Sequence, residues 1–506
     1  MPRLTAIDRL TALWGEVQDL TAAEQLLDWD QETQMPPAGH GARSDVASTI
    51  AGLKHRALVS DALHDSVEAC ADEAEEGSVL AAQVRAARRE VVRARAVPEE
   101  LARSLAAARS RGFAAWRQAR SSSDFAAFAP ALEELVTLRR RQAEALVGLL
   151  PAEDGAPTLY DAMLDEFEPG ARAAELEPLF ATLRAELTPL VAAVAEAPPV
   201  DESPLRGHFD PAAQRRLGLH AATGVGFEFD AGRLDPAAHP FCVGIAPSDV
   251  RLTWRWQDDD LRPGLFGILH ETGHGLYEQG LPAELYRTPA GAAVSLGIHE
   301  SQSRLWENHV GRSRGVWRWL APTLRALFPD APAAADVDRA WAALHVVRPS
   351  LIRVEADEVT YHLHVAARFE LERALFANEV AVGELPGAWD DLYRSMLGVV
   401  ADDVADGVLQ DVHWSHGMFG YFPTYSLGSL AAAQLYAAAE RDLGPLEERF
   451  EADDFATLLG WLRERVHRHG SLLDAGPLIE QATGTPLGAE ALLADLRGLV
   501  AEVYGV

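Results

Sequence analysis

Apolar residues recur at three- and four-residue intervals along most of this chain, which is the spacing of one face of an amphipathic helix. The pattern runs through residues 5–29, 79–119, 124–149, 172–195, 336–347 and 429–441. Stretches rich in proline and glycine interrupt it at 35–39, 151–157 and 198–204. Because such stretches end helices, we expect a mainly α protein that opens with a helical region over about residues 1–200.

One region departs from this period. Short runs rich in β-branched and aromatic residues occupy 226–230, 240–245 and 249–256, and turn residues separate them. Runs of this length and composition are typical of strands. They predict a small antiparallel sheet of two or three strands within about residues 225–257, after which helices resume over 258–506.

Composition narrows the possible partners. The chain has 506 residues and a formal net charge of −31. Such a surface repels phosphate backbones and anionic lipids, so we expect no nucleic-acid partner and no membrane partner. We find no apolar run of about 18 residues that would predict a transmembrane helix, and no secretory signal pattern. Cys70 and Cys242 are too few for a disulfide framework, so a cytoplasmic location is the default expectation.

The first candidate chemistry is an H-E-x-x-H pattern formed by His270, Glu271 and His274. Residues i and i+4 share one face of a helix, so the two imidazoles would point at one place, with Glu271 about 100° around the axis. The same pattern also occurs by chance on ordinary helices and does not establish a metal site by itself. Gly273 and Gly275 weaken a helix, which favours a close approach by another backbone or by substrate.

A metal site needs a further ligand, because catalytic zinc takes three protein ligands and keeps a fourth position open. Glu300 lies 26 positions after His274, among apolar residues spaced as in a buried helix. A carboxylate facing a core is costly unless it is paired or bound to a metal, so His270, His274 and Glu300 are predicted to hold one Zn²⁺ per chain. His299 is a rival ligand, but it lies about 100° from Glu300 on the helix, and a supporting hydrogen-bond role is favoured.

Several motifs, taken in order, resemble those of the M32 metallocarboxypeptidases, the thermostable carboxypeptidase 1 type. They are H-P-F at 239–241, D-x-R-x-T at 249–253, H-E-x-x-H at 270–274, H-E-S-Q at 299–302, I-R-x-x-A-D at 352–357 and G-x-x-Q-D-x-H-W at 407–414. Segments 29–37 and 417–425 are also similar, so the resemblance covers nearly the whole chain. It implies one domain over 1–506, a large saddle-like helical body with a deep active-site groove, a homodimer, and a zinc ion that cobalt can replace.

The resemblance implies zinc-dependent hydrolysis of the C-terminal bond of peptides, with broad specificity. Glu271 would activate a zinc-bound water by taking its proton, and would pass that proton to the leaving amine. Tyr421 and His413 are our candidates for stabilising the oxyanion, with Tyr425 and His416 as alternatives. Each of these four could equally be a packed aromatic or a structural histidine.

A carboxypeptidase must also bind the free C-terminal carboxylate of its substrate, and the fork of an arginine suits this task. Arg353 is the first candidate. It is predicted to lie in a helical run over 351–369, where an ion pair with Asp357 one turn later is the ordinary alternative. Gln410 and Asp411 are expected to be hydrogen-bond partners around the site.

Arg251 is the second candidate for the carboxylate. It alternates along a predicted strand with Asp249 and Thr253, so the three share one face, and a solvated strand face is the ordinary alternative. A strand beside the zinc helix could also pair with an extended peptide. His239 precedes a proline, is therefore expected to be extended, and could line the cleft.

Two other functions stay open at this level. An endo-oligopeptidase or a dipeptidyl carboxypeptidase on a related helical scaffold also uses H-E-x-x-H with a distal glutamate, and spacing does not separate them. A catalytically dead peptide-binding protein is disfavoured, because Glu271 and all three predicted ligands are present.

Overall fold

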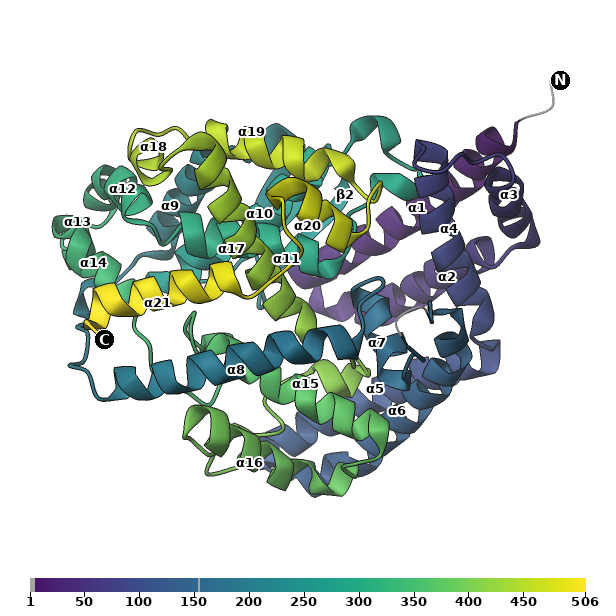
Figure 1. Cartoon of the computed structure of the whole chain (residues 1–506), viewed down its shortest axis with the longest axis horizontal. Helices are drawn as coiled ribbons and strands as arrows, with labels where there is room; N and C mark the ends of the chain where they lie inside the picture. Colours follow the sequence, from purple (N-terminus) through teal and green to yellow (C-terminus); the bar gives the residue numbers. More distant parts are fainter. Residues whose placement is uncertain (1–4, 153–154) are drawn as a thin grey trace.

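The computed structural model describes residues 5–152 and 155–506, and helices dominate it (Figure 1). The helices are α1 (Ala6–Thr33), α2 (His40–Leu58), α3 (Asp61–Ala71), α4 (Val79–Ala96), α5 (Glu99–Ser122), α6 (Phe125–Leu146), α7 (Leu159–Phe167), α8 (Ala173–Ala195), α9 (Pro211–Gly224), α10 (Arg262–Gly280), α11 (Leu296–Arg304), α12 (Arg314–Leu327), α13 (Pro332–Ala335), α14 (Val337–Leu344), α15 (Tyr361–Ala377), α16 (Leu385–Leu397), α17 (Pro423–Leu443), α18 (Glu447–Glu451), α19 (Ala456–Arg465), α20 (Ala475–Thr483) and α21 (Glu490–Tyr504).

The helical segments predicted from periodicity are confirmed, with one subdivision. The run over 79–119 is two helices, α4 and α5, because Pro98 cannot continue α4 and instead precedes the first turn of α5. Local capping explains other boundaries. Thr5 and Asp8 form a capping box at the start of α1, and the Ser295 hydroxyl accepts the Ile298 amide at the start of α11.

The predicted sheet is present, but its topology is mixed rather than antiparallel. It contains β1 (Gly232–Pro236), β2 (Cys242–Ala246) and β3 (Asp249–Trp254) in the order β1-β3-β2. The pairing of β2 with β3 is antiparallel, as predicted, whereas β1 and β3 are parallel. The chain reverses between β1 and β2 without pairing them, and β3 fills the space between, so β3 runs in the direction of β1.

The prediction of a first strand over 226–230 is wrong. Gly226 adopts a left-handed backbone conformation with φ of 105°, and a short 3₁₀ turn follows at Phe229–Ala231. Phe227 is buried in the hydrophobic core. The aromatic residues in this run therefore fill space under the sheet, and the first strand begins only at Gly232.

Two hydrophobic cores lie on either side of α17. One packs the sheet with α9, α10, α12 and α19, and the other packs α6, α7, α8, α15 and α21. α17 contributes Leu435 to the first core and Leu430 to the second. Figure 1 shows α8 and α21 side by side although they are far apart in sequence, and α1 to α4 gathered at one end. The saddle-like shape and groove implied by the resemblance stay predictions.

Within the described residues, one helix, α8, is long and apolar enough to span a membrane by length and composition alone. It buries an apolar stripe that includes Phe180 and Leu187 in the second core. Its two central charges are paired, Arg184 with Glu370 at 3.1 Å and Glu186 with Arg497. These contacts are those of an amphipathic helix that packs one face against the second core.

Candidate metal centre and active site

The site is built where α10 crosses α11 at very short range. A Cβ added to Gly273 would lie 2.5 Å from the Gln302 carbonyl oxygen and 2.6 Å from the Ser303 Cα atom. Only glycine allows this approach, which explains the helix-weakening residue inside the motif. On the other side of α11, a Cβ at Gly428 of α17 would lie 2.5 Å from the Glu300 Cγ atom. α11 is therefore held tightly between α10 and α17.

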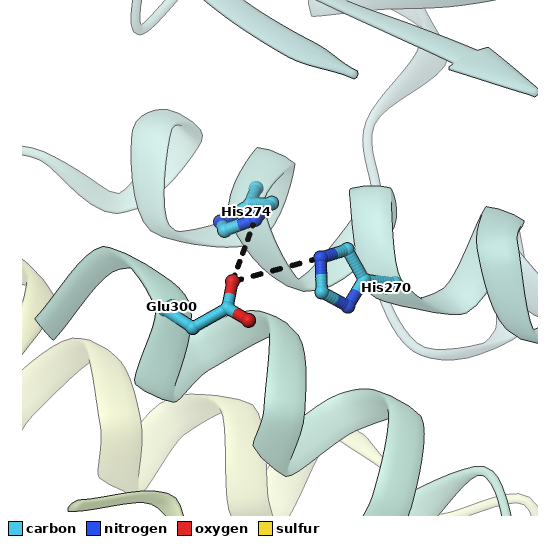
Figure 2. Close-up of side chains that lie close together, drawn as sticks. All are labelled: His270, His274 and Glu300. Atoms are coloured by element: carbon cyan, nitrogen blue, oxygen red, sulfur yellow. Dashed lines mark ion pairs between the residues drawn. The ribbon is translucent and has the colours of Figure 1, made fainter. Parts of the chain in front are cut away.

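This crossing brings together the three side chains predicted as metal ligands. The Glu300 Oε2 atom lies 3.6 Å from His270 Nε2 and 3.4 Å from His274 Nε2. Figure 2 shows both imidazoles on α10 turned toward the carboxylate on α11. One ligand atom from each residue lies within 4.8 Å of the other two. Two imidazole nitrogens and one carboxylate oxygen at this spacing fit a divalent transition metal.

Both histidines are oriented through their second ring nitrogen. His270 Nδ1 lies 2.8 Å from Glu307 Oε2, and His274 Nδ1 lies 3.0 Å from the carbonyl oxygen of His299. These contacts place the hydrogen on Nδ1 and leave each Nε2 free to bind a metal. Glu307 was not predicted from the sequence. Its position seven residues after Glu300, two helical turns along the same face, was the available signal.

His299 lies beside His274 and not opposite Glu300. Its Nδ1 atom is 2.6 Å from His274 Nδ1, and its Nε2 atom is 2.8 Å from Glu278 Oε1. Within the described residues, the group with metal-ligand spacing is His270, His274 and Glu300. The rival assignment of His299 as a ligand therefore has no geometric support.

Burial shifts the proton affinities of the groups in this centre. Burial raises the pKa of Glu271 to about 7, with His270 acting in the opposite direction. Burial alone would lower the pKa of His270, but Glu300 and Glu307 raise it to about 9. Burial and the neighbouring His299 lower the pKa of His274 to about 3. Three carboxyl groups thus surround the histidines and make the centre attractive to a cation.

The edge strand β2 lies along α10 beside these residues. A Cβ at Gly244 would lie 2.2 Å from Glu278 Oε2, so the strand approaches the helix closely. Burial raises the pKa of the Cys242 thiol, and Glu271 and Glu278 raise it further. In the strand order β1-β3-β2, β3 is the central strand and β2 lies at an edge beside the metal helix. A peptide could therefore pair with β2 there, and not with β3 as predicted.

Arg353 does not lie in a helix, which corrects the prediction for 351–369. It lies in a 3₁₀ turn, Arg353–Glu355, and α15 begins only at Tyr361. The predicted alternative partner, Asp357, instead accepts the backbone amides of Val359 at 3.0 Å and Thr360 at 2.9 Å. Because Asp357 accepts backbone amides that would otherwise be free, it favours a helix that begins at Tyr361 over one that begins at 351.

Arg353 belongs to a buried cluster with an excess of positive charge. Its Nη2 atom lies 2.9 Å from Asp411 Oδ1, and Arg368 Nε lies 2.6 Å from Asp411 Oδ2. The Gln410 side-chain oxygen accepts from the Arg353 amide at 2.9 Å and from Arg368 Nη2 at 2.8 Å. Burial lowers the pKa of the adjacent His413 to about 3, so this histidine is neutral. Two guanidinium groups therefore share one carboxylate.

Aromatic hydroxyl groups lie between this cluster and the metal centre. His413 Nε2 lies 3.2 Å from the Tyr425 hydroxyl, and the rings of His413 and Tyr421 are 5.3 Å apart. The Tyr361 hydroxyl accepts from Arg353 Nη1 at 3.2 Å. Burial, with Glu300 nearby, raises the pKa of Tyr421 to about 12. Tyr421 therefore keeps its proton and can act as a hydrogen-bond donor.

The remaining predicted residues lie elsewhere around the sheet. Arg251 pairs with Asp249 through two contacts of 3.0 Å, and its guanidinium lies over the Trp29 ring at 4.3 Å. Thr253 is buried and bonds to the Phe241 backbone. His239 is exposed in the connection between β1 and β2. Among the described residues, Arg251, Thr253 and His239 make no recorded hydrogen bond, ion pair or ring contact with the metal ligands.

The helical body, the H-E-x-x-H helix and the distal glutamate together define a metallopeptidase site. The family model "Carboxypeptidase Taq (M32) metallopeptidase" matches residues 9–499, and the chain belongs to that family. It is an M32 metallocarboxypeptidase, and the resemblance stated from the motifs is confirmed.

Relatives support this assignment over the full length. The chain is 44% identical to thermostable carboxypeptidase 1 of Thermus thermophilus, over 99% of both chains. It is 34% identical to carboxypeptidase 1 of Bacillus subtilis, over 97% of both chains. Its fold is similar to the crystal structure of the M32 carboxypeptidase of Deinococcus radiodurans, with 38% identity, a TM-score of 0.94, and coverage of 99% of this chain and 100% of that one.

Proposed function

We propose that this metallocarboxypeptidase removes residues singly from the C-terminus of peptides, with one zinc ion held by His270, His274 and Glu300. The observation that carries the proposal is the convergence of one ligand atom from each of these residues within 4.8 Å. Two imidazoles and a carboxylate suit zinc, and cobalt accepts the same donors.

Bound zinc would polarise the scissile carbonyl group and make water acidic enough to be activated near neutral pH. Glu271 then acts as the general base. It lies next to His270 on α10 and is buried, and its pKa of about 7 allows it to take a proton and return it to the leaving amine. Tyr421 supplies a proton-bearing hydroxyl for the oxyanion, with Tyr425 and the neutral His413 behind it.

Arg353 is our choice for the substrate carboxylate. Its cluster holds two guanidinium groups against the single carboxylate of Asp411, so one positive charge is left over. An incoming carboxylate would complete this charge balance in a buried setting, where pairing counts most. Arg251 is the second choice, because its guanidinium is already satisfied by Asp249 and Trp29. His239 would contribute only at the rim.

A timed digest of one peptide in two forms tests the reaction. The free-acid peptide should yield a ladder of one-residue losses by mass spectrometry, and a chelator should stop it. The amide-capped twin should be cut at least about tenfold more slowly, since it lacks the charge for Arg353. Equal cleavage of the capped peptide would reject the carboxylate clamp, and two-residue losses would favour the dipeptidyl carboxypeptidase alternative.

We also propose a homodimer and a cytoplasmic location. The dimer is suggested by the family alone, and light scattering on a sizing column tests it. A mass near 54.8 kDa, that of one chain, would reject it. Fractionation of cells with an antibody against the chain tests the location.

A further inference from the structure

The two oxygen atoms of Glu300 have different surroundings. Oε2 faces His270 and His274 at 3.6 and 3.4 Å, and it also accepts the Ser303 hydroxyl at 2.9 Å. Oε1 accepts a hydrogen bond from Arg304 Nε at 2.8 Å. The carboxylate is thus divided between the metal centre and one arginine.

Arg304 is itself held on several sides. Its guanidinium lies over the Tyr361 ring at 4.4 Å, and its Nη1 atom lies 3.5 Å from Glu307 Oε2. Glu307 is the residue that orients His270 through a 2.8 Å contact. Arg304 therefore contacts one ligand, Glu300, and also the residue that orients a second ligand, His270. Gly428 packs closely against the Cβ and Cγ atoms of the Glu300 stem.

We propose that Arg304 is a positioning residue that reserves Oε1 of Glu300, so that only Oε2 serves the metal. Carboxylates bind metals through one oxygen or through both. A second oxygen from Glu300 would occupy the coordination position that hydrolysis needs open. This inference rests on the proposed metal site, and not on the roles of Glu271 or Arg353.

The positive charge of Arg304 distinguishes a positioning role from a role in strengthening metal binding. A guanidinium beside a divalent cation repels it, so removing the arginine would not weaken metal binding by electrostatics. It would instead leave both Glu300 oxygens available. The expected signature is a changed coordination geometry with the metal retained.

Cobalt reports this geometry directly, because the visible absorption of Co²⁺ is strong in four-coordinate sites and weaker with each added ligand. We expect one cobalt per chain in both the wild type and Arg304→Met, with the visible band of the variant weaker by about twofold or more. Peptide hydrolysis should fall by about 10- to 100-fold, in the range seen for outer-shell partners. An unchanged band and unchanged activity in Arg304→Met would overturn the proposal.

Arg312→Met is the matched control. Arg312 has nearly the same side-chain exposure as Arg304, 17% against 16%, and also approaches Glu307 at 3.5 Å. It lies over the Phe266 ring at 4.4 Å and is not recorded in contact with Glu300. Its cobalt spectrum should match that of the wild type. A weakened band in Arg312→Met equal to that of Arg304→Met would overturn the proposal, because any lost guanidinium would then act alike.

Arg304→Lys is a second variant that tests the proposal if Arg304→Met does not fold. The lysine keeps the charge and reaches one carboxylate oxygen, but it lacks the fork that holds Glu300 and Glu307 together. A band between those of the wild type and Arg304→Met, with one cobalt per chain, supports the proposal. A folded Arg304→Lys variant that has lost cobalt would overturn it, because the proposal requires the metal to be retained. A wild-type band in Arg304→Lys, with Arg304→Met unfolded, would overturn it. Because the spectrum is recorded without peptide, failure of the proposed peptidase activity would be seen separately.

Discussion

At the scale of single residues, the environment sets the chemistry of groups that the motif only locates. Glu271 and Glu300 are both buried glutamates near the same histidines. Burial raises the pKa of Glu271 to about 7, whereas Arg304 and the histidines outweigh burial at Glu300 and lower its pKa well below the usual range. One carboxyl group is therefore suited to exchange protons and the other to remain an anionic ligand.

Glu271→Gln tests the base directly. The amide cannot accept a proton, so kcat should fall by about 10²- to 10⁴-fold, while the metal content should stay near one per chain because the three ligands are intact. Peptide hydrolysis and metal analysis on the same sample measure both effects. Retained hydrolysis in this variant would remove Glu271 from the mechanism.

Residues of the supporting contacts were only partly predictable from sequence. The H-E-x-x-H spacing and the distal glutamate were sufficient to locate His270, His274 and Glu300. Glu307 and Arg304 were missed although they lie seven and four residues after Glu300, since charged residues on a helix are usually solvated and local spacing does not show that these two are buried. Glu307 contacts His270 across two helices, which periodicity does not encode, whereas Arg304 contacts Glu300 and Glu307 along its own helical segment.

At the scale of elements, the crossing of α10 and α11 decides whether a site exists. Gly273→Ala would place a Cβ 2.5 Å from the Gln302 carbonyl oxygen, which is backbone and cannot move aside cheaply. We expect a loss of about 1–3 kcal/mol in stability and weaker metal binding. Urea unfolding and metal titration measure these effects.

Gly267→Ala on the same helix is the control for that prediction. The nearest atom to its added Cβ is Pro240 Cγ, at an ordinary 3.9 Å. The variant should gain about 0.5–1 kcal/mol, because alanine suits a helix interior better than glycine. If both variants behaved alike, close helix packing would not be the reason for Gly273.

The start of α11 carries a pH-dependent contact. Glu168 accepts the Gly297 amide at 2.8 Å and is buried, and burial raises its pKa to about 7 from 4.5. Between these pH values the folded chain keeps a proton that the unfolded chain has released. The contribution of Glu168 to the unfolding free energy therefore falls as pH rises from 4.5 to 7 and levels off above it.

Glu168→Gln should remove that loss. The difference in unfolding free energy between the variant and the wild type should shift in favour of the variant by about 3 kcal/mol as pH rises from 5 to 8. This shift does not depend on which of the two is more stable at pH 5. Urea unfolding of metal-free protein at the two pH values gives the difference. A pH-independent difference would show that Glu168 titrates normally in the folded chain.

At the scale of the whole molecule, α17 joins the two hydrophobic cores, with Leu430 in one and Leu435 in the other. If α17 separated from either core, apolar residues of both cores would be exposed to water. The single domain over 1–506 stays a prediction, and metal-free protein should unfold in one calorimetric transition. Two separated transitions would divide the chain into independent units.

Restoring the metal should raise the midpoint of that transition, because the ion binds only where α10 and α11 are assembled. The effect should be abolished in a variant without Glu300, such as Glu300→Ala, and kept in Glu271→Gln. An equal rise in both variants would place the stabilising ion elsewhere.

Local patterns were enough for the helices, the position of the sheet, the metal ligands and the family, because spacing along a helix and motif residues are properties of neighbouring positions. The parallel pairing of β1, the 3₁₀ turn at Arg353 and the contact of Glu307 with His270 were beyond such patterns. Each depends on residues distant in sequence that pack together only after the chain has folded, and so on free energies that no local window contains.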